Sequence, residues 1–278
     1  MQDLKDVVAL VTGASRGLGR ATAVALGERG ATVYVTGRSQ RQRRHPEDLP
    51  GSVEETADEV AARGGQGISA VCNHTLDTDI DLLIERIRRE QGRLDVLVNN
   101  VWGGYEYHDL AEFQKPFWEQ PLRHWDGMFT AGVRAHLVTS RAAARLLFES
   151  DLGLIVSTTA WDQDKYLGNL FYDVAKASIH RMVFGMAREL RTRNVAAVAV
   201  APGFMRTERV LAAHEKEPFD LSRTETPAYA GRVIAALAAD PGRMRWSGQV
   251  LAAATLAREY GVTDVNGTQP PPFDIGPG

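Results

Sequence analysis

The segment Val7-Val8-Ala9-Leu10-Val11-Thr12-Gly13-Ala14-Ser15-Arg16-Gly17-Leu18-Gly19 decides which fold we expect for this chain. Its first five residues form an uninterrupted apolar run, which is typical of a strand buried on both faces of a parallel sheet. Helical spacing follows from Arg16 and ends at Gly30. A glycine turn between strand and helix lets the backbone approach a phosphate, and the helix N-terminus offers unpaired N–H groups. The segment therefore predicts a dinucleotide-binding unit, with candidate contacts at Gly13, Ser15, Arg16, Gly17, Leu18 and Gly19.

Strand-like and helix-like segments alternate along the rest of the chain. Further strands are expected at 32–36, 68–71, 96–99, 154–158, 196–201 and 249–252, and helices at 53–63, 78–91, 126–149, 172–193 and 227–239. This alternation predicts repeated βαβ units with right-handed crossovers. We therefore expect an α/β fold, a Rossmann-like doubly wound parallel sheet of about seven strands with helices on both faces. We expect one dinucleotide-binding and catalytic domain over residues 1–278.

Composition and charge exclude several classes of protein. Hydrophobic residues make up 44% of the chain and charged residues 24%, which does not fit a disordered protein. A net charge of −3 argues against a general nucleic-acid binder, and no apolar run is long enough to span a membrane. Cys72 is the single cysteine, so we expect a buried structural thiol and a reducing compartment. We therefore expect a cytoplasmic protein that binds no nucleic acid, membrane or metal.

The end of the second predicted strand carries a cation where an NAD-binding protein has an acid. The acid would bind the ribose hydroxyls of NAD, but this chain reads Thr36-Gly37-Arg38-Ser39. Arg38, together with Arg16 in the glycine turn, suits a 2′-phosphate through charge-assisted hydrogen bonds. The sequence therefore predicts NADP(H) as cofactor. The arginines that follow are interpreted as a solvated loop, and these are Arg41, Arg43 and Arg44.

Tyr172 and Lys176 lie one turn apart on one face of a predicted helix. A free tyrosine has a pKa near 10, which makes it a poor acid or base at neutral pH. We expect the Lys176 ammonium to lower the pKa of Tyr172 and also to reach the cofactor ribose. The Tyr-x-x-x-Lys spacing alone is common by chance. Its place after the fifth strand, in a chain with the glycine turn, makes it a candidate catalytic pair.

Together these motifs resemble the short-chain dehydrogenase/reductase family. The glycine turn has the spacing Gly-x-x-x-Gly-x-Gly, and Asn99-Asn100-Val101-Trp102 closes the fourth strand where the family usually has Asn-Asn-Ala-Gly. The motifs follow the family order over nearly the whole chain. The resemblance implies further cofactor contacts at Asn73, Asn100, Tyr172, Lys176, Pro202, Gly203 and Thr207. Other segments resemble one subgroup of the family, and these are 92–100, 117–119, 256–261 and 264–267.

Two departures from the family pattern affect the expected active site. The family's active-site serine falls on Ala160 when counted from the strand start, and nearer Thr159 when counted back from Tyr172. A threonine hydroxyl can bond a carbonyl oxygen, so Thr159 is the candidate. Where the family has an asparagine that feeds a proton relay, this chain has Gly132. His136, one turn on, is interpreted as a structural histidine, with a relay water as the alternative.

Two stretches near the expected site are rich in apolar side chains. Most aromatic residues of 101–125 are expected to pack the connection onto its own domain or a partner subunit, and Trp102 and Trp161 are the pocket candidates because each follows a strand end. Residues 204–226 fit a lid that excludes water, or an ordinary surface helix and loop.

The resemblance implies an NADPH-dependent oxidoreductase that moves a hydride between NADP(H) and a small-molecule carbonyl or alcohol. Tyr172 would exchange the proton, and Thr159 would orient the carbonyl. The alternative is a non-enzymatic NADP(H)-binding sensor or assembly protein, and isomerase or dehydratase chemistry stays open because the fold does not fix the function. The family resemblance also implies a homodimer or homotetramer.

Overall fold

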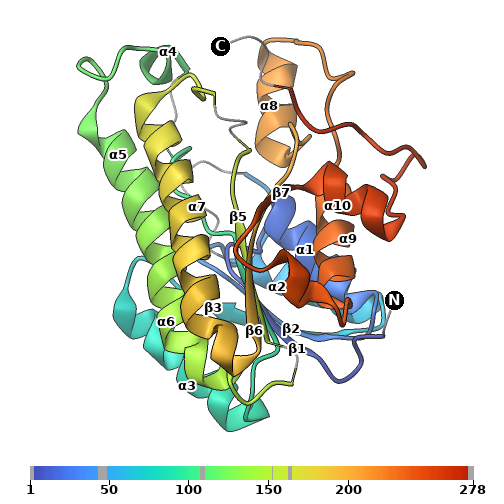
Figure 1. The fold of residues 1–278 in the computed structure, drawn as a ribbon. Coiled ribbons are helices and arrows are strands. Elements are labelled where there is room, and N and C mark those ends of the chain that lie inside the picture. The colour runs from blue at the N-terminus through green and yellow to red at the C-terminus, as the bar shows by residue number, and fades with distance from the viewer. Residues whose placement is uncertain (1–2, 43–48, 107–109, 152, 162–164, 275–278) are drawn as a thin grey trace.

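The computed structural model describes residues 3–42, 49–106, 110–151, 153–161 and 165–274. Seven parallel strands form one sheet in the order β3-β2-β1-β4-β5-β6-β7 (Figure 1). The strands are β1 (Val8–Val11), β2 (Thr32–Gly37), β3 (Gln66–Val71), β4 (Val96–Asn99), β5 (Gly153–Thr158), β6 (Val195–Ala201) and β7 (Val250–Ala252). The expected doubly wound parallel sheet is therefore confirmed, with each strand within two residues of its predicted bounds.

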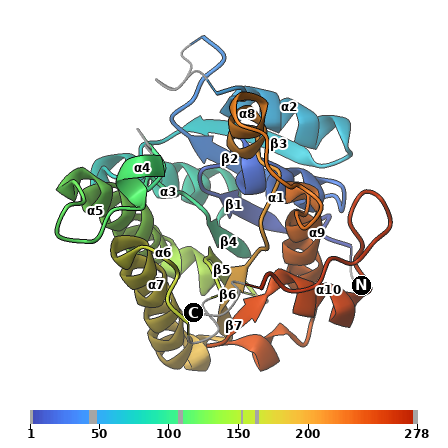
Figure 2. The ribbon, with the colours of Figure 1, turned by 90° about the horizontal axis from the view of Figure 1, so that it is seen from above.

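Helices cover both faces of the sheet, as Figures 1 and 2 show from the side and from above. One face carries α1 (Gly17–Gly27), α2 (Val53–Ala62), α9 (Pro227–Ala238) and α10 (Ala253–Tyr260), and the other α3 (Asp77–Gln91), α6 (Ala135–Leu147) and α7 (Leu170–Leu190). Successive side chains of β1 alternate between the two cores. Ala9 and Val11 pack toward α1, whereas Val8 and Leu10 pack toward α3 and α6.

The long helix expected at 126–149 differs from the prediction. The structure begins it earlier, at α5 (Leu122–Met128), and continues through a π-helical turn (Phe129–Arg134) into α6. Periodicity alone cannot reveal such a turn, because the wider winding depends on what packs against it. Two short helices also lie inside predicted connections, α4 (Leu110–Phe113) and α8 (Glu208–Lys216), and α10 follows the last strand without having been predicted.

The strand order reverses between β1 and β4, which are neighbours in the sheet. Ligands of open α/β sheets bind at the carboxyl ends of the strands beside such a reversal. Asn100 joins the two strands there, because its Nδ2 donates to the carbonyl oxygens of Thr12 at 3.0 Å and Gly13 at 3.1 Å. The site expected from sequence therefore lies on the edge of the sheet that carries α4 and α8, at the top of Figure 1.

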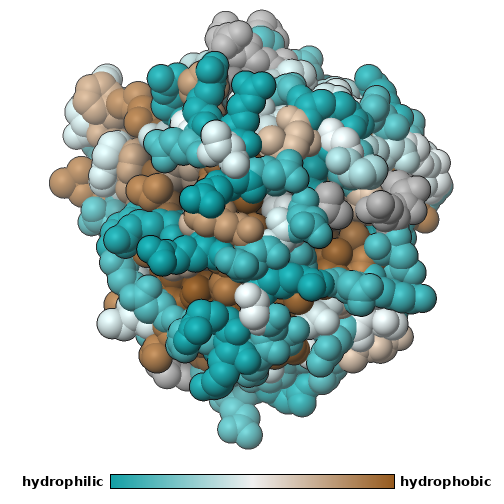
Figure 3. All heavy atoms as spheres, turned by 60° about the horizontal axis from the view of Figure 1, so that its bottom comes forward, coloured by the Kyte–Doolittle hydropathy of each residue, from teal (hydrophilic) through white to brown (hydrophobic). Residues whose placement is uncertain are grey.

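In Figure 3, where the bottom of Figure 1 comes forward, hydrophilic side chains surround smaller hydrophobic areas. Within the described residues, no helix combines the length and apolar character needed to cross a bilayer. The same part of the chain contains no cluster of three or more histidine, cysteine or acidic side chains placed to hold a metal ion.

Candidate active site

A cavity of about 890 Å³ runs along the carboxyl ends of the strands. Its wall contains every residue that the sequence predicted for the site except one: Gly13, Ser15, Arg16, Gly17, Leu18, Arg38, Asn73, Asn100, Thr159, Tyr172, Lys176, Pro202, Gly203 and Thr207. The exception is Gly19, which lies in α1 behind the turn. A Cβ at Gly19 would lie 2.3 Å from the carbonyl oxygen of Gly13, so this glycine serves close packing of the turn on the helix.

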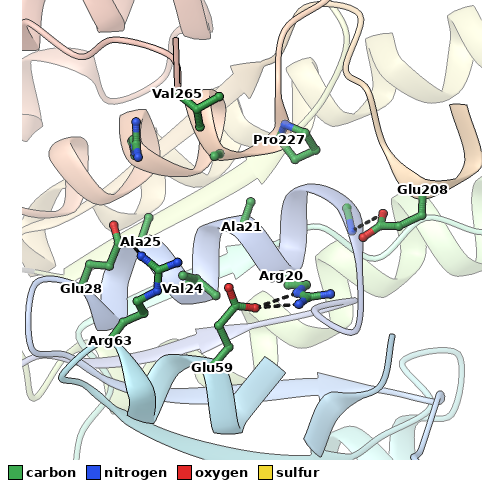
Figure 4. Close-up of a pocket in the computed structure, with 13 residues that line it drawn as sticks. Arg20, Ala21, Val24, Ala25, Glu28, Glu59, Arg63, Glu208, Pro227 and Val265 are labelled. Carbon is green, nitrogen blue, oxygen red and sulfur yellow. Dashed lines mark hydrogen bonds and ion pairs between the residues drawn. The ribbon is translucent and has the colours of Figure 1, made fainter. Parts of the chain in front are cut away.

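The glycine turn presents the first amide of α1 to the cavity. Gly17 has a φ of +55°, a left-handed conformation that favours glycine. Its backbone N–H donates a hydrogen bond to Oε2 of Glu208 at 2.9 Å, drawn as a dashed line in Figure 4. The Gly17 amide is therefore oriented to donate to an anionic oxygen, as is expected at a helix N-terminus.

A second, smaller cavity of about 300 Å³ lies on the outer side of α1, between α2 and α9 (Figure 4). Two ion pairs cross it, Arg20 with Glu59 at 2.8 Å and Arg63 with Glu28 at 3.0 Å. Glu208 and Gly17 line both cavities. The smaller cavity is thus a charged groove whose side chains largely neutralise one another.

The two arginines predicted to hold a 2′-phosphate also have protein partners. The guanidinium of Arg16 donates to the carbonyl oxygen of Pro50 at 3.0 Å and to Oγ of Ser39 at 3.0 Å, which fastens the loop before α2 to the glycine turn. Arg38 forms an ion pair with Glu106, from the connection after β4. The sequence did not predict Glu106 as a site residue, because no local pattern relates the connection after β4 to the end of β2.

The solvated-loop interpretation of the following arginines is only partly covered by the structure. Arg41 is exposed and pairs with Asp58 on α2, as a surface side chain would. Arg43 and Arg44 lie outside the described residues, and so does Tyr107.

Cys72 is a buried free thiol, which confirms its expected burial, and burial raises its pKa to about 12.

Tyr172 and Lys176 lie together on the first turns of α7, in the wall of the cavity. The Lys176 Nζ is 5.2 Å from the centre of the Tyr172 ring. Burial raises the pKa of Tyr172 well above 10, and the neighbouring Tyr105 hydroxyl, to which Tyr172 is hydrogen-bonded, raises it further. Burial also lowers the pKa of Lys176 to about 7. The expected lowering of the Tyr172 pKa is therefore wrong for this geometry, because desolvation outweighs a cation that is itself easily deprotonated.

This electrostatic arrangement has a chemical consequence. A tyrosine with a raised pKa stays protonated at neutral pH, so the Tyr172 hydroxyl is available as a proton donor. Lys176 is 7% exposed and titrates near neutrality, so its charge responds to small changes around it.

A buried asparagine fixes the position of Tyr172. Asn169 caps α7 by accepting a hydrogen bond from the backbone N–H of Tyr172 at 3.0 Å. Its Nδ2 donates to the carbonyl oxygen of Phe113 at 2.7 Å and to Oε1 of Gln120 at 2.9 Å. The cap therefore joins α7 to the connection after β4. An asparagine three residues before Tyr172 is an N-cap signal that can be read from the sequence.

Aromatic side chains surround the Tyr172 ring. Trp102 and Phe113 contact it edge-on, with ring centres 5.7 and 6.1 Å away, and Tyr105 stacks on it at 6.3 Å. Trp102 and Trp161 line the cavity, as expected, and Tyr105 does so as well. The packing expected for most aromatic residues of this connection is seen at Trp125, which stacks on Phe129 with ring centres 3.8 Å apart. Phe117 and Trp118 do not pack onto their own domain, since 53% of Phe117 and 71% of Trp118 are exposed, and packing onto a partner subunit stays a prediction for them.

The structure brings both strand-end threonines to the cavity. Thr158 is the last residue of β5 and Thr159 follows it, and both line the wall. The Thr159 backbone N–H donates to the carbonyl oxygen of Val200 at 3.0 Å. Its Oγ1 lies 3.5 Å from the carbonyl oxygen of Ala160, at the limit of a hydrogen bond, so the hydroxyl is not tied to a strong partner. Ala160, the alternative position for the family serine, carries no hydroxyl.

His136 lies behind the cavity wall. Its Nε2 is 3.1 Å from the carbonyl oxygen of Val101, and burial, reinforced by the charge of Lys176, lowers its pKa to about 3. The ring is therefore neutral at physiological pH. These contacts favour the structural interpretation of His136 over a relay through a bound water.

The segment after β6 covers the cavity with α8. Thr207 caps this helix, accepting from the backbone N–H of Val210 at 3.3 Å. Phe204 and Phe219 stack with ring centres 6.0 Å apart and both line the cavity. Beneath them Glu225 is 2% exposed, and its Oε1 accepts from the backbone N–H of Gly203 at 2.9 Å. Burial raises the pKa of Glu225 to about 7.

Comparisons with known proteins identify the family of this chain. A sequence model of the short chain dehydrogenases matches residues 7–218. Dehydrogenase/reductase SDR family member 1 of Mus musculus is 38% identical over 276 residues, which cover 95% of this chain and 85% of that protein. The 3-oxoacyl-[acyl-carrier-protein] reductase of Synechocystis is 30% identical over 253 residues, 90% of this chain and 96% of that protein.

Solved structures also resemble this chain. A short chain dehydrogenase from Shigella flexneri, complexed with NADP, is 25% identical, has a TM-score of 0.75, and aligns with 91% of this chain and 99% of that chain. The glycine turn, the Tyr172–Lys176 pair and the sheet order thus occur in a chain that matches the family along most of its length. This chain therefore belongs to the short-chain dehydrogenase/reductase family.

Proposed function

We propose that this protein is an NADP(H)-dependent oxidoreductase that reduces a small-molecule carbonyl to an alcohol, with Tyr172 as proton donor. One observation carries the proposal: a single cavity contains the glycine turn at one end and the Tyr172–Lys176 pair at the other. The first holds the phosphates of a dinucleotide, and the second supplies acid–base chemistry. The reverse oxidation of an alcohol uses the same groups.

The residues of the cavity fit a nicotinamide dinucleotide. The Gly17 amide already donates to a carboxylate oxygen, so it suits a pyrophosphate oxygen. Arg38 lies at the end of β2, where the adenosine ribose of a dinucleotide is expected, and its charge suits a 2′-phosphate. This arrangement supports NADP(H) over NAD(H), although Glu106 competes for the same cation.

The chain's own residues then account for the proton chemistry. The cofactor, when bound, supplies the hydride that adds to the carbonyl carbon. Tyr172 is protonated at neutral pH and donates its hydroxyl proton to the carbonyl oxygen. The Lys176 ammonium stabilises the phenolate that this transfer leaves, until a proton from solvent restores the hydroxyl. Thr159 donates a hydrogen bond that orients the carbonyl.

The names of relatives support carbonyl reduction as the reaction class. They include the 3-oxoacyl reductase above and a 5-keto-D-gluconate 5-reductase of Escherichia coli, which is 26% identical over 212 residues. The aromatic wall of Trp102, Tyr105 and Phe204 favours an apolar carbonyl compound in this chain. A cytoplasmic location stays a prediction from the composition of the chain, and a homodimer or homotetramer stays a prediction from the family resemblance.

The test combines cofactor binding with turnover. Dissociation constants for NADPH and NADH are measured by fluorescence titration, and NADPH oxidation is then followed with a panel of apolar ketones and aldehydes. Tighter binding of NADPH and oxidation with at least one carbonyl support the proposal. Equal or tighter binding of NADH would overturn the cofactor assignment. Binding without turnover on the whole panel would favour a sensor or assembly protein.

A further inference from the structure

The ammonium of Lys176 lies on the face of an indole ring. Its Nζ is 3.5 Å from the centre of the Trp102 ring, closer than the 5.2 Å to the Tyr172 ring. Both side chains line the cavity, and Lys176 is 7% exposed. A cation over the face of tryptophan is attracted by the ring quadrupole, most strongly when water is excluded. The indole is therefore the group best placed to hold the ammonium.

Two glycines make room for this indole. A Cβ at Gly132, in the π-helical turn, would lie 2.6 Å from a ring carbon of Trp102, and a Cβ at Gly104 would lie 2.7 Å from another. Real Cβ atoms do not approach so closely, so any larger residue at either position would displace the ring. Position 132 is where the family resemblance led us to expect an asparagine. Trp102 and Gly132 therefore complement each other, because the indole ring occupies the space that a side chain at position 132 would need.

The indole also touches the proton donor. Trp102 and Tyr172 meet edge-on, with ring centres 5.7 Å apart and planes at 88°. The same ring therefore contacts both members of the catalytic pair. The titratable groups around the Lys176 ammonium come from three elements: Tyr172 on α7, Tyr105 after β4 and His136 on α6. At neutral pH each tyrosine stays protonated because its pKa is raised, and His136 is neutral because its pKa is lowered, so none of the three groups is charged.

We propose that Trp102 is a positioning residue, whose indole face holds the Lys176 ammonium beside Tyr172 in the space left open by Gly132. Its catalytic consequence rests on the proposed function, since the held cation stabilises the Tyr172 phenolate formed during reduction. The contact itself does not depend on any substrate. If the contact stabilises the charged form of Lys176, removing the aromatic ring at position 102 lowers the pKa of Lys176. A smaller aromatic ring there preserves much of the stabilisation.

The titration of Lys176 tests this directly in the free protein. The chain has few lysines, Lys5, Lys115, Lys165, Lys176 and Lys216, so ¹³Cε signals of labelled lysine resolve, and Lys176→Met assigns the relevant one. In Trp102→Leu the pKa of Lys176 is expected to fall by roughly 0.5 to 1.5 units, the shift that corresponds to loss of a desolvated cation–π contact. In Trp102→Phe the fall is expected to be less than half as large.

Glycine variants provide a matched pair that leaves the indole in place. Gly132→Ala pushes a Cβ into the ring and is expected to shift the Lys176 titration in the same direction as Trp102→Leu. Gly185→Ala makes the same substitution on α7, where the added Cβ meets nothing within 4 Å, and is expected to leave the titration unchanged. If Trp102→Leu fails to fold, Trp102→Phe and Gly132→Ala still decide the outcome.

An unchanged Lys176 titration in folded Trp102→Leu or Gly132→Ala would overturn the proposal. So would equal shifts in the leucine and phenylalanine variants, because volume rather than the ring would then be responsible. With a carbonyl substrate, kcat/KM is expected to fall about tenfold in Trp102→Leu and to recover partly in Trp102→Phe. If no carbonyl is reduced but the titration shifts as expected, the proposed function fails while the Trp102–Lys176 contact stands.

Discussion

Glu208 and Gly17, 191 positions apart in the chain, are joined by a hydrogen bond of 2.9 Å from the Gly17 amide to the Glu208 carboxylate. The bond connects the first turn of α8 to the N-terminus of α1, and Figure 4 shows the side chain reaching across to it. The amide is also the group that a pyrophosphate is expected to use. A dinucleotide that binds here must therefore displace the Glu208 carboxylate or lie close to its negative charge.

Replacing Glu208 with glutamine tests this competition. The amide of Glu208→Gln keeps the shape and can still accept from Gly17, but it removes the charge that repels phosphate. We expect NADPH to bind roughly three- to tenfold more tightly, as suits one partly solvated charge pair. Isothermal titration at low and high salt measures the effect, which should shrink as salt rises. Glu215→Gln, an exposed residue of the same helix, is the control and should leave affinity unchanged. Weaker binding in Glu208→Gln would mean that the carboxylate assists the cofactor instead.

Arg38 and Glu106 are expected to set the cofactor preference together. Arg38→Asp places an acid at the end of β2 and should invert the preference from NADPH to NADH, because the acid binds ribose hydroxyls and repels a 2′-phosphate. Glu106→Gln should do the opposite and raise the NADPH preference several-fold, since Arg38 loses its ion-pair partner. The ratio of the two dissociation constants measures both. A ratio that neither variant changes would show that the 2′-phosphate is recognised elsewhere.

Thr159 is expected to orient the substrate carbonyl. Thr159→Val removes the hydroxyl at nearly constant shape, and kcat and kcat/KM should fall together by roughly ten- to a hundredfold if the bond forms mainly in the transition state. Thr159→Ser should keep much of the activity. Thr158→Val is the companion variant, because both threonines line the cavity. Damage from Thr158→Val with a silent Thr159→Val would move the role to Thr158.

Glu225 is expected to make stability depend on pH. Its folded pKa of about 7 lies above the reference value for glutamate, so the folded state binds the proton more readily than the unfolded state. The resulting stability is fully present below pH about 4.3 and is lost as pH rises through about 7, by up to roughly 4 kcal/mol. Glu225→Gln keeps an acceptor for the Gly203 amide and should flatten this dependence. Urea unfolding from pH 5 to 8 makes the comparison, and parallel curves for the two proteins would contradict it.

The fold was predictable because its signals are local. The apolar run at Val7–Val11, the glycine turn and the alternating segments each report on a stretch of neighbouring residues, and right-handed crossovers restrict how such units assemble into a sheet. The cavity wall was predicted partly by the glycine turn and partly by the family resemblance, which supplied Asn100 and Gly203.

What the sequence did not predict depends on contacts between distant segments. The ion pair of Arg38 with Glu106 and the bond of Glu208 to Gly17 join residues that no periodicity relates. The pKa of Tyr172 was expected to fall and is raised, because its burial and its bond to Tyr105 appear only once the connection after β4 is folded over α7. The π-helical turn has a similar origin, since Gly132 there faces the Trp102 ring.

Proton donation by Tyr172 is the central claim, and Tyr172→Phe tests it most directly. The phenyl ring keeps the contacts with Trp102 and Phe113 and removes only the hydroxyl. The measurement is the rate of NADPH oxidation by wild type and variant with one reducible carbonyl, alongside the NADPH dissociation constant of each. We predict a rate lower by roughly a hundredfold or more with cofactor affinity retained. A variant that binds NADPH normally and keeps most of its rate would show that another group donates the proton.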